Sequence, residues 1–336
     1  MSWIFRNESI EIFRFSFVLK MVYQLLYLVA ITSGKIEILQ GEIMTSSYVF
    51  ILSSIFDLGN AQSVIGDYKV FHTLQHLKAL IVSSIILLPV LIAGIPIFVA
   101  PLLASSGIIR NIYIVNDNIR SLALLDLRSF ILSLSGLFIA INFNATLLWV
   151  VFIPVLSETI VLLTLYIRIL LKLRFRVSPR FAFWYNNAQD TILNQLDILL
   201  ISRFFDARIS ENYFLIREWY KRVAQASNMV YLRLLYNYTV SLKWYLVWGY
   251  LLVSGLIYLH TYYAVILFVI PDIYLVYTLI RRGGIKLLNI LQLMRFLLFS
   301  LGLLIMAPMD SFAFSELLLI ITIYVFEIRH SKRHSL

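Results

Sequence analysis

The sequence contains no cysteine, and this absence excludes several kinds of chemistry at once. A chain without thiols has no disulfide framework, no thiolate nucleophile and no cysteine-ligated zinc or iron–sulfur centre. The redox compartment is left open. Charged residues are also scarce: they make up 14% of the 336 residues, against about a quarter in soluble domains, while 61% are hydrophobic. This composition predicts a polytopic membrane protein.

Motifs of soluble enzymes are missing as well. The chain has no G-x-x-x-x-G-K-[ST] phosphate loop, no G-x-S-x-G elbow and no H-E-x-x-H helix. All five histidines are predicted to lie in loops or tails. His72 and His76 are four residues apart but have no third ligand near them in sequence, so a metal site is not expected. We therefore do not expect ATP hydrolysis, and we predict no metal or cofactor.

The basic residues give a formal net charge of +10 and lie in short clusters between apolar runs. This pattern favours orientation by the positive-inside rule over nucleic-acid binding. The most basic stretch, residues 168–180, holds five Lys or Arg residues and no acid. It is either a solvated linker without further function or a contact site for anionic lipid headgroups. The N-terminus is read as retained rather than as a cleaved signal peptide.

Twelve apolar stretches are long enough to predict membrane-spanning helices. The run 79–115 is too long for one span, and Gly94, Pro96 and Pro101 offer the break. With both termini cytoplasmic, most loop Lys and Arg residues fall inside, including Arg110, Arg120 and Arg128. Only Lys35, Arg203 and Arg208 fall outside. The spans lie near 12–31, 46–66, 79–95, 97–115, 129–143, 146–167, 182–203, 211–236, 242–259, 262–280, 286–307 and 313–328.

Ionisable side chains inside spans are the candidate functional residues, because a charge at the bilayer centre costs at least about 2.5 kcal/mol. Arg217 and Lys221, four residues apart, repel each other unless an anion or an acid lies between them. Glu218 and Arg222 have the same spacing and are expected to neutralise each other. Basic residues inside spans are Arg14, Lys20, Arg217, Lys221, Arg222 and Arg295.

The acidic residues placed inside spans are Asp57, Glu158, Asp190, Asp197 and Asp272. In the span near 182–203, a polar stripe runs down one helix face through Asn187, Asp190, Asn194 and Asp197. Such a stripe lines a water-filled path or joins neighbouring helices through hydrogen bonds, and two carboxylates favour the path. Asp272 follows Pro271, a helix disturbance that frees carbonyls near a carboxylate.

Two passages carry a family resemblance. FDLGNAQSVIGDY, with Asp57, Leu58 and Gly59, ends the second span, and LDILLISRFFDARISENYF, with Asp197 and Tyr213, opens the second half. Together with six spans on either side of a basic link, these passages resemble the multidrug/oligosaccharidyl-lipid/polysaccharide exporters, specifically the bacterial O-antigen and capsule flippases.

The resemblance implies an all-α integral membrane fold of two six-helix bundles related by a pseudo-twofold axis along the membrane normal. Residues 1–167 would form the first bundle, 168–181 the cytoplasmic linker, and 182–336 the second bundle with a short basic tail. The implied location is the bacterial cytoplasmic (inner) membrane, with both termini cytoplasmic.

The implied function is a flippase, a transporter and not an enzyme, that moves undecaprenyl-pyrophosphate-linked oligosaccharides by alternating access, for O-antigen, lipopolysaccharide or capsule synthesis. Expected partners are this substrate, membrane lipids, a polysaccharide polymerase and a chain-length regulator, without nucleic acid. A proton or sodium gradient is the expected driving force. Residues expected to contact the substrate are Lys20, Arg217, Lys221, Arg14, Arg295, Asn187 and Asn194. Candidates for ion coupling are Asp190, Asp197, Asp272 and Asp57.

Two alternatives stay open. A membrane-embedded polysaccharide polymerase would also be polytopic and basic, although that class carries a large outside loop that is not predicted here. A drug or metabolite antiporter of the same superfamily would share the architecture, with fewer buried cations and more acids expected.

Overall fold

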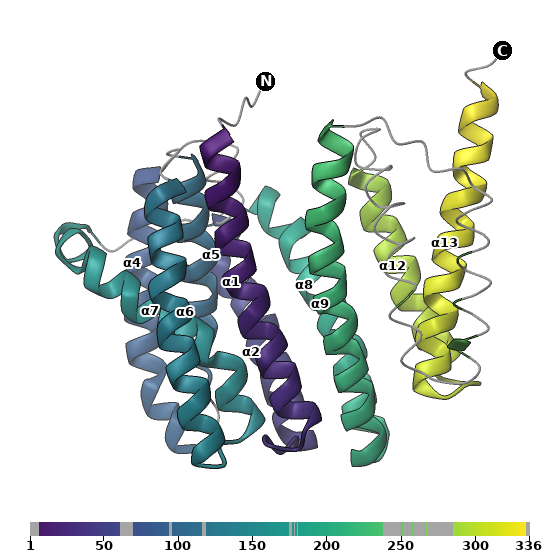
Figure 1. Cartoon of the computed structure of the whole chain (residues 1–336), viewed down its shortest axis with the longest axis horizontal. Coiled ribbons are helices and arrows are strands. Elements are labelled where there is room, and N and C mark those ends of the chain that lie inside the picture. The colour runs from purple at the N-terminus through teal and green to yellow at the C-terminus, as the bar shows by residue number, and fades with distance from the viewer. Residues whose placement is uncertain are drawn as a thin grey trace. The chain divides into compact units, whose positions relative to one another are not determined.

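The computed structural model describes residues 7–60, 70–93, 96–115, 119–174, 181–237 and 285–333, with isolated positions between 177 and 267. Over these residues the protein is all-α and contains ten α-helices and one 3-10 helix (Figure 1). The chain divides into two compact units, Met1–Ser202 and Arg203–Leu336, which are taken in turn.

The first unit is a helical bundle in which α1 packs on α6, α6 packs on α7, and both α2 and α4 pack on α5. Its core includes one cluster around Leu77, Leu125 and Leu162, and another around Val99 and Phe152. The elements are α1 (Asn7–Thr32), α2 (Gln40–Asp57), α4 (Val70–Leu87), η1 (Leu88–Ala93), α5 (Val99–Val115), α6 (Ile119–Asn142), α7 (Leu147–Lys172) and nearly all of α8 (Phe181–Phe204).

The second unit contains α9 (Ala207–Asn237), α12 (Ile285–Gly302) and α13 (Pro308–Arg333). Helices α12 and α13 pack closely along each other, and α9 also contacts α13. Tyr213 of α9 is fully buried and lies against the rings of Phe299 and Phe312. The core of this unit is therefore strongly aromatic.

Three helices in the described part of the chain are long and apolar enough to cross a membrane. Their apolar windows are Leu74–Leu91, Ser121–Asn142 and Leu147–Thr164. Shorter apolar segments occur at Met21–Thr32 and Leu293–Gly302. These features agree with a membrane protein.

Helices are found at ten of the predicted span positions, whereas the stretches near 242–259 and 262–280 lie almost entirely outside the described residues. Several boundaries were wrong: α4, for example, begins at Val70, nine residues before the predicted span. Two further differences have a clear cause. Helix α2 ends at Asp57 instead of continuing toward residue 66, because Leu58 and Gly59 both have positive φ angles, 48° and 77°. Helix α6 begins at Ile119, ten residues before the predicted span, and residues Ser121–Asn142 within it form one predominantly apolar stretch.

The predicted loop containing Arg110, Arg120 and Arg128 is therefore wrong in extent. Arg110 lies on α5, and the other two lie on α6. The predicted break of the run 79–115 is confirmed: α4 passes into η1, and α5 starts at Val99, whose N–H bonds to the Pro96 carbonyl at 3.0 Å. Pro101 lies in the first turn of α5, where its missing N–H leaves no helical hydrogen bond unmade.

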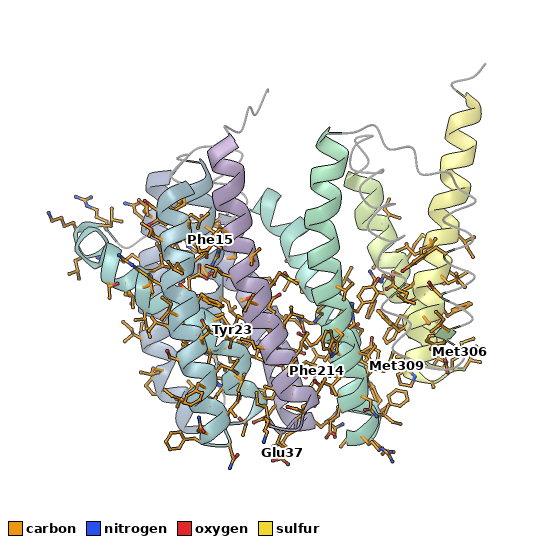
Figure 2. The ribbon with its side chains drawn as sticks, viewed as in Figure 1. Phe15, Tyr23, Glu37, Phe214, Met306 and Met309 are labelled. Carbon is orange, nitrogen blue, oxygen red and sulfur yellow. The ribbon has the colours of Figure 1, made fainter. Side chains whose placement is uncertain are left out.

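Pro154 lies inside α7 and removes the N–H that would bond to the carbonyl of Val150. The hydroxyl of Tyr23, labelled on α1 in Figure 2, donates to that carbonyl at 3.3 Å. A side chain of α1 thus satisfies a buried acceptor that the proline leaves unpaired, and it ties α1 to α7.

We expect Tyr23→Phe to lower the free energy of unfolding by about 1 kcal/mol, because the Val150 carbonyl stays buried without its donor. Thermal unfolding in detergent measures the effect. Tyr48→Phe, at a tyrosine that is 51% exposed, is the matched control. Equal stability of the two variants would contradict this role of Tyr23.

A glycine sets the distance between α12 and α13. A Cβ atom at Gly302 would lie 3.1 Å from Ser311 Cβ and 3.3 Å from its Cα, so the two backbones approach closely here. At Gly41 of α2 a Cβ atom would meet nothing within 4 Å. The same substitution at the two positions therefore separates a steric clash from a change in helix propensity.

We expect Gly302→Val to destabilise the protein by about 1 to 3 kcal/mol more than Gly41→Val, because only the first forces the two helices apart. Thermal unfolding of the two variants, side by side, gives the difference. Similar melting temperatures would show that α12 and α13 tolerate a wider separation.

Candidate functional site

The candidate site is a cluster of two arginines, two aromatic rings and one glutamate in the second unit. We call it the arginine–aromatic cluster: Arg217 and Tyr220 from α9, Arg295 from α12, and Phe312 and Glu316 from α13. Figure 2 shows the described side chains of these helices as sticks and labels Phe214, a buried residue on α9, and Met309, the second residue of α13.

Glu316 is the centre of the cluster and has no exposed surface. One of its carboxylate oxygens pairs with the Arg295 guanidinium, and the other accepts a hydrogen bond from the Tyr220 hydroxyl at 3.0 Å. Three helices thus meet at one carboxylate. A buried ion pair is weak evidence for stability, but losing one partner leaves an uncompensated charge and costs roughly 3 to 5 kcal/mol.

Arg217 and Arg295 lie against the same aromatic rings. The Arg217 guanidinium carbon is 4.9 Å from the centre of the Phe312 ring and 5.6 Å from that of Tyr220. The Arg295 guanidinium carbon is 5.8 Å from each. Ring faces attract cations, and a guanidinium gives up hydration more readily than an ammonium does. The rings therefore help to hold two positive groups close together in a mostly apolar unit.

Lys221 has an acidic neighbour on its own helix. Its ammonium lies 3.2 Å from a carboxylate oxygen of Glu218, three residues earlier. An acid therefore offsets one charge of the Arg217–Lys221 pair. The predicted pairing of Glu218 with Arg222 stays a prediction, because the Arg222 side chain lies outside the description.

The structure brings Arg217, Lys221 and Arg295, three predicted substrate contacts, into one unit, on α9 and α12. Arg14 and Lys20 lie on α1 of the first unit, and their side chains are not described. The same holds for Asn187, Asp190 and Asn194 on α8. Their roles stay predictions.

Among the predicted coupling acids, Asp197 is buried on α8, and its carboxylate accepts a hydrogen bond from the Ile198 N–H at 2.8 Å. Asp57 is buried at the end of α2, where the Asn60 amide donates to its backbone carbonyl at 3.0 Å. Asp272 lies outside the described residues. The roles of these acids in ion coupling stay predictions.

The sequence reasoning missed Glu316, Tyr220 and Phe312. Glu316 lies in the predicted span 313–328, one span after Arg295, and an acid within an apolar run should have prompted a search for a basic partner. The aromatic residues gave no separate signal, because the chain is rich in them: 24 Phe and 20 Tyr.

A second buried ionic group lies in the first unit. Arg110 Nη2 is 2.7 Å from Asp126 Oδ1 on α6 and 2.7 Å from Glu158 Oε2 on α7. Arg110 was predicted in a cytoplasmic loop, and this is wrong because the two buried carboxylates draw it into the bundle. The group joins three helices and has the geometry of a structural clamp.

The prediction that all histidines lie in loops or tails was also wrong. His76 is buried on α4, and its Nε2 lies 3.1 Å from the Phe56 carbonyl. This contact satisfies one of the two ring nitrogens, on a helix packed against α5. Among the described residues, no group of three His, Asp or Glu side chains is placed to hold a metal ion.

The pairing of Arg295 with Glu316 predicts how the free energy of unfolding differs between single and double variants. Arg295→Gln and Glu316→Gln should each lower the free energy of unfolding by about 3 kcal/mol or more, because each leaves a buried charge unpaired. The double variant should recover most of that loss, because both charges are gone. Unfolding of all four proteins gives a double-mutant cycle. Additive losses would contradict a direct pair.

Comparisons of the chain with protein-family models, with curated proteins and with solved structures give no match.

Proposed function

We propose that the protein is a flippase for lipid-pyrophosphate-linked oligosaccharides of the undecaprenyl class in the bacterial cytoplasmic membrane. In this proposal twelve spans form two six-helix bundles, and the arginine–aromatic cluster in the second bundle binds the pyrophosphate. The apolar helices and the basic loops support a membrane location. The resemblance of the passages around Asp57 and Asp197 supports the substrate class.

The observation that carries the proposal is the pair of guanidinium groups against one aromatic ring. A pyrophosphate carries several negative charges and is bound best by planar donors that reach two of its oxygens at once. Arg217 and Arg295 supply such donors on two adjacent elements of an apolar unit. A protein that only needed to hold three helices together would gain more from apolar side chains at these positions.

Glu316 gives this site two states, one in which it pairs with Arg295 and one in which a bound pyrophosphate takes its place. When no anion is present, the carboxylate keeps the Arg295 charge compensated in a low-dielectric setting. An incoming pyrophosphate competes with Glu316 for Arg295, so binding biases the packing of α12 against α13. A ligand changes a conformational equilibrium only by its differential affinity for the two states, and this exchange supplies such a difference. Alternating access then follows from two arrangements of the helices.

The other predicted contacts complete the proposal. Asn187 and Asn194 on α8 are proposed to bind sugar hydroxyls, and Arg14, Lys20 and Lys221 to add positive charge along the path. Asp57, Asp190, Asp197 and Asp272 remain the proposed sites at which a proton or sodium gradient drives transport.

The test is a transfer assay in proteoliposomes that contain a fluorescent lipid-pyrophosphate-linked saccharide. The decisive variant combines Arg295→Gln with Glu316→Gln, because it removes the arginine without leaving the glutamate unpaired. We expect it to insert normally and to lose at least about 90% of transfer, since a phosphate contact to arginine contributes well over 1 kcal/mol. Arg217→Gln is expected to give a similar loss.

The matched control combines Arg203→Gln with Arg208→Gln, which removes two exposed positive charges outside the cluster. Transfer by this control should equal that of the unmodified protein. Normal transfer by the Arg295 and Glu316 double variant would refute the pyrophosphate site. If the unmodified protein moves no lipid-linked sugar, the polymerase and the antiporter become the functions to test.

A further inference from the structure

An apolar groove of about 390 Å³ opens between α4, η1, α5 and α7 in the first unit. The surface that it exposes is apolar and includes Ile81, Ile85, Leu102 and Leu171; the polar residues Lys78, Ser84 and Thr159 also border it. Ile85 is 65% exposed and Leu171 is 71% exposed, so the groove is open to the surroundings of the bundle. An open apolar groove on a membrane protein is suited to a hydrocarbon chain.

One end of this groove is basic. Lys78, which lines it, donates from Nζ to the carbonyls of Leu173 at 2.6 Å and Leu171 at 3.3 Å. Lys172 and Arg174 come from the same chain segment and are exposed. Among the described residues neither of them forms an ion pair, and the sequence from 168 to 180 contains no acid. The chain segment bonded to Lys78 at this end of the groove therefore carries two exposed basic residues.

Capping explains part of this arrangement. The last carbonyls of a helix have no partner within it, and Lys78 satisfies two at the end of α7. This accounts for Lys78 and fixes the end of α7 beside the groove. It does not account for Lys172 and Arg174, two exposed basic residues that form no ion pair among the described residues and lie in the segment beside the groove.

The length of the groove matches one half of a bilayer. Lys78 and Leu88, both in the lining, are ten residues apart along α4 and the start of η1, which is about 15 Å of helix. The hydrocarbon core of a bilayer is about 30 Å thick. A chain that starts at the basic end and runs toward Leu88 would cross one leaflet, and the positive-inside rule makes this the cytoplasmic leaflet.

We propose that this groove is a binding site for an anionic phospholipid. One acyl chain lies along α4 between α5 and α7, and the phosphate is held by Lys172 and Arg174, with Lys78 fixing the end of α7. Basic pockets between helices at the cytoplasmic face are where anionic headgroups bind. The proposal is independent of the flippase function, because it concerns a different unit and a different ligand.

The experiment uses the purified full chain in detergent, exposed to equal amounts of phosphatidylglycerol and phosphatidylcholine, with bound lipids counted by native mass spectrometry. The unmodified protein should retain one phosphatidylglycerol in preference to phosphatidylcholine. Lys172→Gln combined with Arg174→Gln should lower this preference by roughly tenfold or more. The double variant Arg203→Gln with Arg208→Gln, at two other exposed arginines, is the charge control and should keep it.

The groove itself is tested by Ile85→Trp, which places a large ring in the channel at an exposed position. Its control is Ile86→Trp, at the next residue, which is 69% exposed and is not part of the lining. Only the first should reduce the bound lipid. No preference for phosphatidylglycerol in the unmodified protein would overturn the proposal. Equal lipid retention by the two tryptophan variants would overturn it too, because the lipid would then bind without placing its acyl chain in the groove.

Discussion

The constraint on which the structure depends is the cost of a charge inside an apolar bundle. Each buried cation described above lies beside a group that compensates it. Arg110 lies between two carboxylates, Arg295 pairs with Glu316, and Arg217 lies against the ring of Phe312. Removing a partner exposes the full desolvation penalty of the charge that is left. The helices that carry these groups are therefore held in register with one another.

The two ionic groups differ in what they offer to a ligand. Around Arg110, two carboxylates share one guanidinium, an arrangement that repels anions and joins α5, α6 and α7. In the arginine–aromatic cluster the arrangement differs, because two guanidinium groups lie against the same aromatic ring, that of Phe312, and one of them, Arg295, pairs with the buried Glu316. An anion that enters this second group finds donors that are already desolvated and oriented. That difference is why we place the proposed pyrophosphate site in the second unit.

Most helix positions followed from the sequence. Long apolar runs and prolines determine where a helix lies or breaks through residues that are neighbours in the chain. The break before α5 came from Pro96 and its neighbours. The end of α2 and the start of α6 were missed. The positive φ angle at Leu58 depends on packing as well as on sequence, and Arg120 and Arg128 led residues 119–128 to be placed in a basic loop although Ser121–Asn142 is apolar overall.

For the site, the unusual residues were found but not all of their partners. A charged residue within an apolar run can be recognised from the sequence alone, so Arg217, Lys221 and Arg295 were singled out. Their surroundings depend on which helices meet. Glu316 is 21 positions after Arg295 in the chain, and Tyr220 is 96 before Glu316, so no local pattern joins them. The same reason explains why Arg110, read as a loop residue, proved to be the centre of a buried group.

The central claim is that an anion and Glu316 compete for Arg295. It is tested most directly by the affinity of a short-chain polyprenyl pyrophosphate for the purified protein, measured by calorimetry. The account predicts that Glu316→Gln binds the ligand more tightly than the unmodified protein, because the competitor is gone. It also predicts that adding Arg295→Gln to this variant abolishes the gain and weakens binding by at least about tenfold. Equal affinity in all three proteins would contradict the claim and leave the pair a structural one.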